Sequence, residues 1–415
     1  MVHSVLLAKF RQSPAVRLLE TIDDVFRRSV DGKILQKQIS LERLVDLSTF
    51  TETTDHRDTI YALLNLANDI NSGPTTSEIR SISPNYRKTV LDVFVEFFLH
   101  CRLTTRSLDI LCRPWAPSYP SMEHSLPGNE YDPTIPQDYP SWIACRDLLP
   151  YGNPAWRLQY RSHGVPLVGD SRRRIYNAHY TTFPCISVGK DDKGNCDGTL
   201  FARGIVMGKI GRRSTRLADA IITKECLEIL GEVVRKPHSG LIDLPDTIWR
   251  TLCADRDGHG YTANSDFRVA MLHLSGEHSH TPPDLEVSTK VLEHMSSIDI
   301  VEELANDTLP EHVRQYLRVV RDVIWNRRTF RSRTDDGTEG NLIGLAPQHA
   351  RIGDHICLLY GCSVPVILRQ VTYGDQLQAW KLIGDAFVYG VMEGEAFRTV
   401  FKHTMTNEEM EFNIR

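Results

Sequence analysis

A cluster of charged residues near the amino terminus has the composition of an acid–base site. Asp55, Arg57, Asp58 and Tyr61 lie close together, and carboxylates beside an arginine can move protons or bind an anionic group. In a structural interpretation, Asp55 caps a helix, Asp58 lies in its first turn and Arg57 pairs with a carboxylate elsewhere. Because charged residues are common at helix starts without any chemistry, we favour the structural role.

A second acidic segment has the spacing of a calcium-binding loop. Asp255, Asp257, His259, Gly260 and Asp266 fall on the first, third, fifth, sixth and twelfth positions of an EF-hand loop. Histidine is a poor ligand for a hard cation, and Asp266 is shorter than the glutamate that usually closes such a loop. A helix that ends in a glycine-rich turn accounts for the same residues, so no metal is predicted.

Two further patterns approach cofactor sites without matching them. His273, Glu277, His278 and His280 have neither H-E-x-x-H nor zinc-finger spacing, which favours a solvated loop. Segment 204–209 has one residue too few between its glycines for a phosphate loop and lacks a Ser or Thr after its lysine. No G-x-S-x-G segment is present, and no thiol or hydroxyl has a recognisable base partner. The sequence predicts no cofactor and no catalytic residue.

Arginine-rich segments could bind nucleic acid if the fold gathered them. Their members are Arg172, Arg173, Arg174, Arg212, Arg213, Arg327, Arg328, Arg331 and Arg333. The chain carries 48 Lys and Arg against 53 Asp and Glu, a formal net charge of −5, and aromatic residues do not interleave with these arginines. Separate solvated faces are therefore the favoured interpretation, and no nucleic-acid partner is expected.

The composition is that of a globular protein with room for two or three domains, since 41% of the residues are hydrophobic and 24% are charged. Its longest apolar stretches, such as 90–99, are interrupted by Asp92 and Glu96 before the roughly 18 to 20 residues of a membrane span. The amino terminus has too short an apolar core for a signal peptide. Nine cysteines without a C-x-x-C pair indicate reduced thiols. We expect a cytoplasmic location without membrane contact.

The hydrophobic periodicity predicts an α+β fold that begins with a helical region at 1–113. Ser40 is a good N-cap for a helix with apolar residues at helical spacing. A second helix is predicted over 58–67. Ser83 followed by Pro84 predicts the start of a third, because proline is favoured at the first helical position.

The rest of the chain is predicted to have two further parts. Repeated prolines make 114–150 an extended connector. Residues 151–415 form a mixed α+β region with strand-like runs such as 205–207, a helical insert at about 220–330 and a β unit at about 340–401. Glycines at turn-like intervals in that unit predict a small, strongly bent sheet or partial barrel.

Several segments, in this order, resemble the region that follows the amino-terminal domain in fungal heterokaryon-incompatibility (HET) proteins. They read T-D-H-R-D-T-I-Y-A-L-L (54–64), P-N-Y (84–86), Y-P-S-W-I (139–143), W-R-T-L-C-A-D-R (249–256), G-D-H-I-C-L-L-Y-G-C-S-V-P-V-I-L-R (353–369) and G-D-A-F-V-Y-G-V-M-E-G (384–394). The residues at motif positions are Asp55, Arg57, Asp58, Tyr61, Pro84, Tyr86, Trp142, Arg256, Gly353, Asp354, Gly361, Pro365, Arg369, Gly384, Gly390 and Gly394. His56 departs from the pattern, because the family usually has proline there.

The resemblance implies a role in fungal non-self recognition, in which full-length members trigger programmed cell death. It implies a non-catalytic regulatory or partner-sensing carboxy-terminal part, with the TIR-like amino-terminal HET domain, the place of any activity, missing. The expected partners are proteins, either that domain or an incompatibility partner. An enzyme with acids near Asp55 and Asp58, or near Asp255 and Asp257, is one alternative. A nucleic-acid-binding module that uses the arginines is another. Strongly shifted acids in a cleft would favour the former, and arginines that converge on one face would favour the latter.

Overall fold

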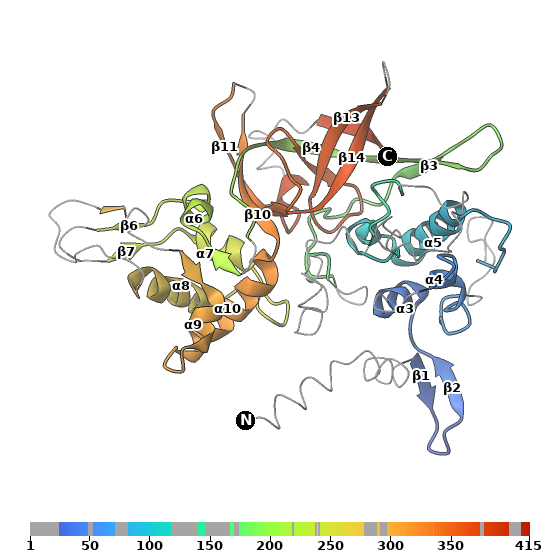
Figure 1. Cartoon of the computed structure of the whole chain (residues 1–415), viewed down its shortest axis with the longest axis horizontal. Coiled ribbons are helices and arrows are strands. Elements are labelled where there is room, and N and C mark those ends of the chain that lie inside the picture. Colours follow the sequence, from blue (N-terminus) through green and yellow to red (C-terminus); the bar gives the residue numbers. More distant parts are fainter. Residues whose placement is uncertain are drawn as a thin grey trace, which may run out of the picture.

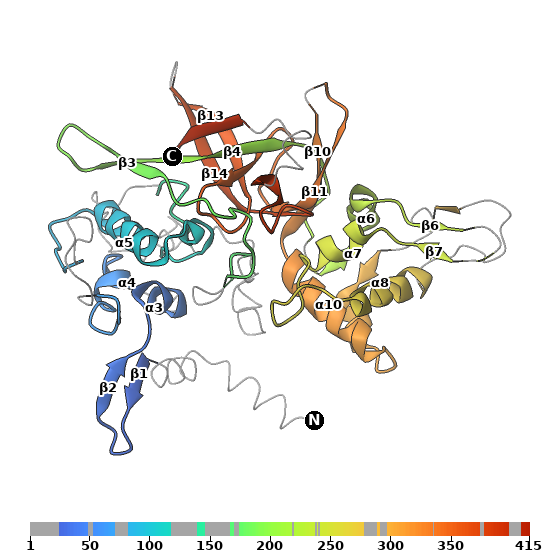
Figure 2. The same cartoon turned by 180° about the vertical axis from the view of Figure 1, so that it is seen from behind.

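The computed structural model is an α+β protein, as the sequence predicts. A large sheet lies between two groups of helices, one formed by the amino-terminal part of the chain and one by its middle (Figures 1 and 2). The structure describes residues 25–48, 53–70, 82–117, 139–145, 167–169, 174–217, 220–236, 239, 241–277, 289–290, 297–334, 336–373, 377–397 and 408–415.

The large sheet has nine strands and is partly closed by a ring of five. The strand order is β12-β13-β14-β16-β4-β10-β11-β15, and β3 pairs with β4. Because β12 also pairs with β4, strands β12, β13, β14, β16 and β4 close on themselves. The strands are β3 (Ile186–Lys190), β4 (Cys196–Arg213), β10 (Arg327–Arg333), β11 (Glu339–Pro347), β12 (His355–Leu359), β13 (Val366–Tyr373), β14 (Leu377–Asp385), β15 (Phe387–Val388) and β16 (Glu408–Ile414).

Two strands of the ring come from outside the β unit predicted at 340–401. One is β4, which contains the predicted strand 205–207, and the other is the last strand, β16. The close pairing of β4 with β12 requires Gly204, because a Cβ there would lie 2.4 Å from the carbonyl oxygen of Leu358. The bent sheet that the glycines predict therefore forms, but distant segments complete it.

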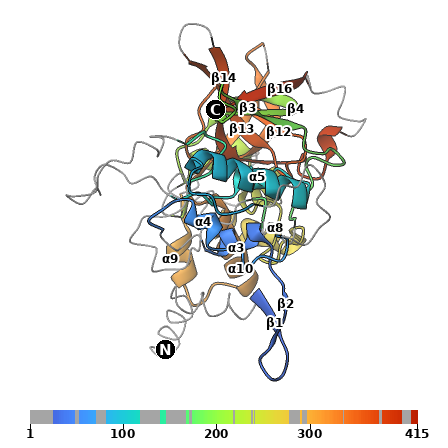
Figure 3. The same ribbon diagram turned by 90° about the vertical axis from the view of Figure 1, so that its right-hand side faces the viewer.

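The amino-terminal helices are α3 (Leu41–Leu47), α4 (Asp58–Tyr61) and α5 (Val90–Thr105), followed by the 3-10 helix η1 (Asp109–Cys112). Ser40 caps α3 as predicted, since its side chain accepts the N–H of Arg43. The helix predicted over 58–67 ends at Tyr61 and continues as turns. A separate hairpin of β1 (Phe26–Arg28) and β2 (Ile34–Lys37) projects from this region (Figure 3).

The predicted start of α5 at Ser83 and Pro84 is wrong. The helix begins at Val90, and Thr89 is its N-cap, accepting the N–H of Asp92 at 3.1 Å. Arg57 donates to the carbonyl oxygens of Tyr86 and Lys88, which come just before α5. Those two oxygens are therefore bonded to Arg57 instead of to a helical N–H. The contact that delays the helix is made by a residue far away in sequence.

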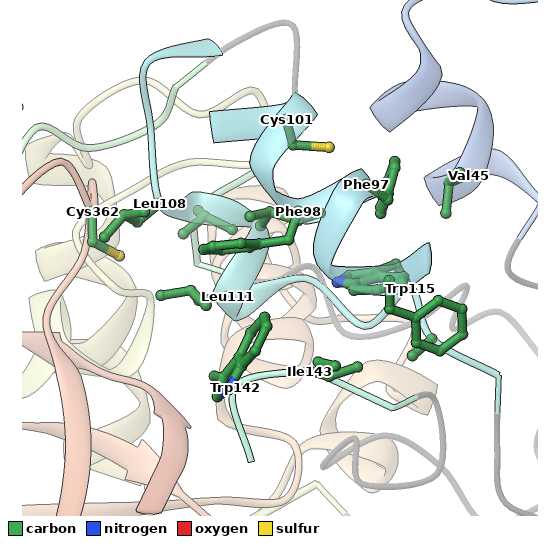
Figure 4. Close-up of a cluster of buried hydrophobic side chains, with 14 of the residues drawn as sticks. Val45, Phe97, Phe98, Cys101, Leu108, Leu111, Trp115, Trp142, Ile143 and Cys362 are labelled. Atoms are coloured by element: carbon green, nitrogen blue, oxygen red, sulfur yellow. The ribbon is translucent and has the colours of Figure 1, made fainter. Parts of the chain in front are cut away.

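The amino-terminal helices share one hydrophobic core with the sheet. Phe94 and Phe97 of α5 pack edge-on against Trp115, with ring centroids 4.9 Å apart in each pair. Phe98 packs against Trp142 at 5.1 Å, and Figure 4 shows Phe97, Phe98, Trp115 and Trp142 in one cluster, with Cys362, which follows β12, beside Leu108. The same core includes sheet residues such as Leu200, Leu345, Cys357, Val366 and Phe412.

The middle of the chain forms a helical insert with a core of its own. Its helices are α6 (Lys224–Leu230), α7 (Asp246–Leu252), α8 (Ser265–Glu277), α9 (Ile300–Ala305) and α10 (Glu311–Ile324). Short strands accompany them: β5 (Ile221–Ile222), β6 (Val234–Arg235), β7 (Ile242–Asp243), β8 (Thr289–Lys290) and β9 (Ile298–Asp299). On α10, Val313, Tyr316, Leu317, Val320 and Ile324 are buried at helical spacing.

Little of the predicted connector at 114–150 is described. In the described pieces, Ala116 forms a parallel β-bridge with Cys145, and the N–H of Trp115 reaches the carbonyl oxygen of Ala144 at 3.1 Å. A 3-10 helix, η6 (Glu395–Phe397), follows β15. Among the helices of the described residues, none has the length and apolar character needed to cross a membrane.

Candidate functional site

Arg57 is the centre of a network that joins two motif segments. Its Nε and Nη2 donate to Asp55 Oδ1 and Oδ2 at 2.9 and 2.7 Å. Its Nη1 donates to the carbonyl oxygens of Tyr86 and Lys88 at 2.7 and 2.9 Å. The carboxylate that Arg57 pairs with among the described residues is therefore its neighbour Asp55, whereas a carboxylate elsewhere in the chain was predicted. Asp55 accepts the N–H of Arg57, the residue before α4, and does not cap α4 itself.

Tyr86 completes this network on the protein surface. Its ring lies under the guanidinium of Arg57 at 5.2 Å and packs edge-on against Tyr61 at 5.4 Å. Its hydroxyl donates to Asp58 Oδ1 at 2.6 Å, and the Tyr61 hydroxyl donates to the carbonyl oxygen of Asn85 at 3.2 Å. The network locks the segment before α5 onto α4.

The hydrogen bonds of this network favour an ionised Asp55 carboxylate and a protonated Tyr86 phenol. The hydrogen bond from Arg57 lowers the pKa of Asp55, although partial burial opposes the shift. The hydrogen bond to Asp58 raises the pKa of the Tyr86 phenol. A general acid or base near neutral pH requires the opposite shifts, so these groups suit binding and positioning.

The closing signature contains a second arginine–aspartate pair. Arg369 on β13 donates from Nε and Nη2 to the two carboxylate oxygens of Asp354, both at 2.8 Å. Arg369 Nη2 also reaches the carbonyl oxygen of His349 at 2.7 Å, and Asp354 accepts the N–H of Arg351 at 2.7 Å. Gly353 turns the chain into β12 with a φ of 92°. Asp354 and Arg369 thus fix the loop before β12 to β13.

Gly361 joins the sheet to the amino-terminal helices. Its carbonyl oxygen accepts the N–H of Leu108 at 2.9 Å and the hydroxyl of Ser107 at 3.1 Å. Its φ is 83°, and a Cβ would lie 2.5 Å from the ring of Pro184. Both the turn and the close approach require glycine.

The remaining glycines of the signature permit turns at other places. A Cβ on Gly384 would lie 2.9 Å from Pro347, and one on Gly394 would lie 2.8 Å from Tyr180. Gly390 has a φ of 73° with open space around it. Two of these three glycines therefore allow close packing, and the third serves the backbone turn alone.

Two further motif positions are packing contacts. Trp142 is buried, and its Nε1 donates to the carbonyl oxygen of Gly198 at 3.0 Å while its ring packs on Phe98. The carbonyl oxygen of Pro365 accepts the N–H of Ala386 at 2.8 Å. Both contacts join segments far apart in sequence.

Arg256 connects the helical insert to the sheet region. Its guanidinium lies 4.3 Å from the ring centroid of Tyr176 and donates to the carbonyl oxygen of Ile175 from Nε and Nη2 at 3.2 and 2.9 Å. It also forms an ion pair with Glu393. Arg256 therefore serves as a cross-link between regions.

The acids near Arg256 are occupied by protein groups. Asp255 forms an ion pair with Arg250 and has a left-handed backbone with a φ of 52°. Asp257 Oδ1 accepts the N–H groups of His259 and Tyr261 at 2.9 and 2.8 Å. The segment is a turn held by its own carboxylates.

The other histidines and acids that resembled metal ligands are not brought together. Asp266 lies in the first turn of α8, and His273 lies further along the same helix. The side chain of Glu277, together with His278 and His280, lies outside the described residues. Within the described ranges, no group of three or more His, Cys, Asp or Glu side chains is arranged to hold a metal ion.

Residues 316–405 match the Het-6 beta-barrel domain. This match links the chain to fungal heterokaryon-incompatibility proteins. It begins within α10 and covers β10 to β15, whereas β4 and β16 of the strand ring lie outside it. No curated protein and no solved structure matches the chain.

The Het-6 match divides the motif positions into two sets. Inside it lie Gly353, Asp354, Gly361, Pro365, Arg369, Gly384, Gly390 and Gly394. Outside it lie Asp55, Arg57, Asp58, Tyr61, Pro84, Tyr86, Trp142 and Arg256. The first set shapes the strand ring and its contacts, and the second attaches other regions to one another or to the sheet.

Two buried ion pairs were missed by sequence reasoning. Arg113 pairs with Glu42 and donates to the carbonyl oxygen of Gly169 at 3.1 Å. Burial raises the pKa of Glu42, although Arg113 opposes the shift. Arg327 Nη2 donates to Asp385 Oδ1 at 2.8 Å. The partners lie 71 and 58 residues apart in sequence, and no local pattern marks such pairs.

Two of the arginine-rich segments come together on neighbouring strands. Arg212 of β4 lies opposite Arg331 of β10 in the antiparallel ladder. Arg174 lies elsewhere, beside His179, and residues 172–173 lie outside the described part of the chain. The fold therefore gathers arginines that the sequence analysis treats as separate.

The cysteines are free thiols, and several are buried. Burial raises the pKa of Cys226 and of Cys253 to about 12. A thiol with so high a pKa is a poor nucleophile at neutral pH. Cys112 and Cys362 lie with their sulfur atoms 4.0 Å apart between η1 and the sheet.

Proposed function

We propose that this chain is the non-catalytic, partner-sensing part of a heterokaryon-incompatibility protein. The proposal is supported by how the motif residues are used, because most of them hold distant segments together. The carboxylates of Asp55, Asp255 and Asp354 are each held by an arginine. Acid–base catalysis would need such groups free and poised near neutral pH.

The contact surface that we propose lies around Tyr86. Tyr86 is 55% exposed, and Pro84 and Arg87 beside it are also exposed. The ring is held by Arg57 and its hydroxyl by Asp58. An exposed aromatic side chain in a fixed position loses little conformational entropy on binding and is typical of protein contact sites. We call this set, Pro84, Tyr86 and Arg87, the Tyr86 surface.

The proposed partner is a protein, either a HET-type domain or an incompatibility partner. Binding would bias an on/off equilibrium of the effector domain, since a contact made in only one state shifts the population toward that state. In this role the chain has to be stable and to bind its partner specifically, and it needs no catalytic residue.

The contact surface can be tested by titrating the purified chain with a purified HET-type domain. Tyr86→Ala is expected to weaken binding by about 30-fold or more, as for a central aromatic contact. Tyr86→Phe keeps the ring and removes only the hydroxyl that bonds Asp58, so it should bind nearly as well. Equal loss in both variants, or no loss in either, would contradict the proposed surface.

The absence of catalysis can be tested in a fungal host. Expression of this chain alone should leave growth and nicotinamide dinucleotide pools unchanged, whereas a fusion to a HET-type domain should become toxic under a trigger. Toxicity of the chain alone would overturn the proposal. So would turnover of a nucleotide or ester by the purified chain that stops in Arg57→Ala at unchanged stability.

A further inference from the structure

Cationic side chains from four strands and a loop surround residues 348–349. They are Arg213 at the end of β4, Arg216 just after it, Arg328 on β10, Arg369 on β13 and Lys381 on β14, and we call them the cation cluster. Figure 2 shows that all four strands belong to the large sheet.

Hydrogen bonds to the backbone hold the cluster in place. Arg328 donates from Nε to the carbonyl oxygen of Gln348 at 2.7 Å and from Nη1 to that of Ser214 at 2.9 Å. Arg213 donates to the same Ser214 oxygen at 3.3 Å. Arg216 reaches the Gln348 side chain at 3.4 Å. Ser214 and Gln348 therefore gather three arginines.

The other side of the cluster comes from β13 and β14. Arg369 donates to the carbonyl oxygen of His349 at 2.7 Å, and Lys381 lies directly opposite Arg369 in the antiparallel ladder. Like charges directly opposite one another destabilise a sheet. This pairing therefore needs compensation from a negative charge, of which Asp354 supplies one.

Most of the positive charge in the cluster is uncompensated. Arg369 pairs with Asp354, but the other four cations form no ion pair with a carboxylate of the residues that the structure describes. The buried Arg327 shows the usual arrangement, because it has Asp385 as its partner. Four neighbouring cations without a carboxylate partner raise the free energy of the folded chain and favour the binding of any anion that can reach them.

The pKa values of Arg113, which has a carboxylate partner, and of Arg328, which has none, differ in direction. Burial lowers the pKa of Arg113, but Glu42, Asp109 and Asp46 together outweigh burial and the pKa is raised. Burial lowers the pKa of Arg328 as well, the neighbouring Arg213 and Arg216 lower it further, and the opposing effect of Glu225 is too small to reverse the shift. Arg328 therefore lies in an excess of positive charge, where a bound anion would restore the balance.

The cluster also has an unused donor and an open approach. Arg213 Nε is buried and has no hydrogen-bond partner among the described residues, which is uncommon for a buried polar atom. Arg216, His349 and Lys381 are exposed. A ligand can therefore approach from solvent through the exposed side chains, and a small rearrangement of Arg213 would give it one further donor.

We propose that the cation cluster binds a small soluble anion that carries two or more phosphate groups. Arginine forks match the oxygens of phosphate, and several cations around one point suit a compact polyanion. A nucleic-acid site would need a basic stripe or stacking aromatics. The five cations converge on one loop from different strands instead of following one element, and the chain has a net charge of −5.

The test is calorimetric titration of the full chain with inorganic pyrophosphate at low salt. One saturable site is expected, and Arg328→Gln should weaken binding about tenfold or more, as for the loss of a charged hydrogen-bond donor. Arg333→Gln is the matched control, because Arg333 is exposed on the same strand and lies outside the cluster. It should bind pyrophosphate as the unchanged chain does.

A second variant covers the case in which Arg328→Gln disturbs folding. Lys381 is exposed and lies opposite the like charge of Arg369, so Lys381→Gln should not lower the unfolding midpoint and should weaken pyrophosphate binding up to about fivefold. His349 gives a local readout, because burial and then Arg369, Arg328, Arg216 and Lys381 lower its pKa. Bound pyrophosphate should raise that pKa, as followed by NMR with His349→Gln for assignment.

Several outcomes would overturn the proposal. They are no pyrophosphate binding, binding that Arg328→Gln and Lys381→Gln leave unchanged, or an equal loss in Arg333→Gln. Tighter binding of duplex DNA than of pyrophosphate, with the steep salt dependence of phosphate-backbone contacts, would identify a nucleic-acid surface instead.

Discussion

The two groups of helices meet the sheet in different ways. The amino-terminal helices share a single hydrophobic core with the sheet, in which α5 residues and sheet residues such as Leu200 and Val366 belong to one cluster. The insert helices have a separate core, to which the sheet contributes Ile343. The amino-terminal helices are thus a layer of the main fold, and the insert is a unit attached to it.

Polar contacts show the same contrast. The amino-terminal region reaches the sheet through backbone bonds, such as Leu108 to Gly361 at 2.9 Å, and through the N–H of Ser363 donating to the buried carboxylate of Asp109 at 2.7 Å. The insert is attached by side chains at its edge, such as Arg256 with Glu393. We therefore expect a destabilising substitution in the amino-terminal region to open the sheet as well, and one in the insert to open the insert alone.

The largest effect is expected from Trp142→Ala. Removal of this fully buried ring should lower the free energy of unfolding by about 3 to 5 kcal/mol. Hydrogen exchange should show α5 and the sheet losing protection together. Phe183→Ala is the control, because Phe183 is 66% exposed and its loss should change little. Loss of protection confined to α5 would contradict the shared core.

Arg113→Ala should be nearly as damaging, because it leaves the carboxylate of Glu42 buried without its partner. The expected cost is about 3 to 5 kcal/mol. The pKa of Glu42 lies above its unfolded value, so the stability of the variant should be greatest at low pH and fall as pH rises through that pKa. The double variant Glu42→Leu with Arg113→Met should regain stability in urea unfolding, and failure to do so would show that the ion pair is not the cause.

A leucine-to-alanine substitution in each of two cores compares the sheet with the insert directly. Leu358 of β12 and Leu317 of α10 are both fully buried, and either change to alanine should cost about 2 to 5 kcal/mol locally. Leu358 belongs to a cluster of sheet residues that no α5 residue joins, so Leu358→Ala should expose the sheet to exchange, whereas Leu317→Ala should expose the insert helices. An unchanged unfolding midpoint in Leu358→Ala would show that its assignment to the core is wrong.

Gly361→Ala tests the joint between sheet and helices. Alanine would have both an unfavourable φ and a clash with Pro184, for an expected loss of about 1 to 3 kcal/mol. Gly390→Ala is the matched control, because Gly390 also has a positive φ but nothing lies within 4 Å of a Cβ there. It should lose about 1 kcal/mol. Equal losses in thermal unfolding would mean that the close approach to Pro184 is unimportant.

The smallest effect is expected for Asp55→Asn. The Asp55–Arg57 pair is partly exposed, with 30% and 18% of the two side chains accessible, so the loss should be about 1 kcal/mol or less. The pKa of Asp55 is lowered, so its contribution is present above the unfolded pKa and is lost as pH falls through the folded value. Stability measured against pH should therefore converge for the two proteins in acid.

Local features of the fold could be predicted where neighbours in sequence decide them. Ser40 caps α3 because the cap bond reaches only three residues ahead. Strands β12 and β13 of the β unit predicted at about 340–401 form because their apolar runs lie between turns that the glycines permit. Helix α5 starts later than predicted because Arg57, from another segment, takes carbonyl oxygens of the turn.

The α+β class and the motif residues could be predicted from the sequence, because both depend on residue types at short spacing. Three features could be found only in the folded chain: β4 and β16 complete the strand ring, Glu42 is buried beside Arg113, and Arg213 and Arg328 lie beside one loop. Each of these contacts joins residues far apart in sequence. Such pairings depend on how the whole chain packs, and no local periodicity records them.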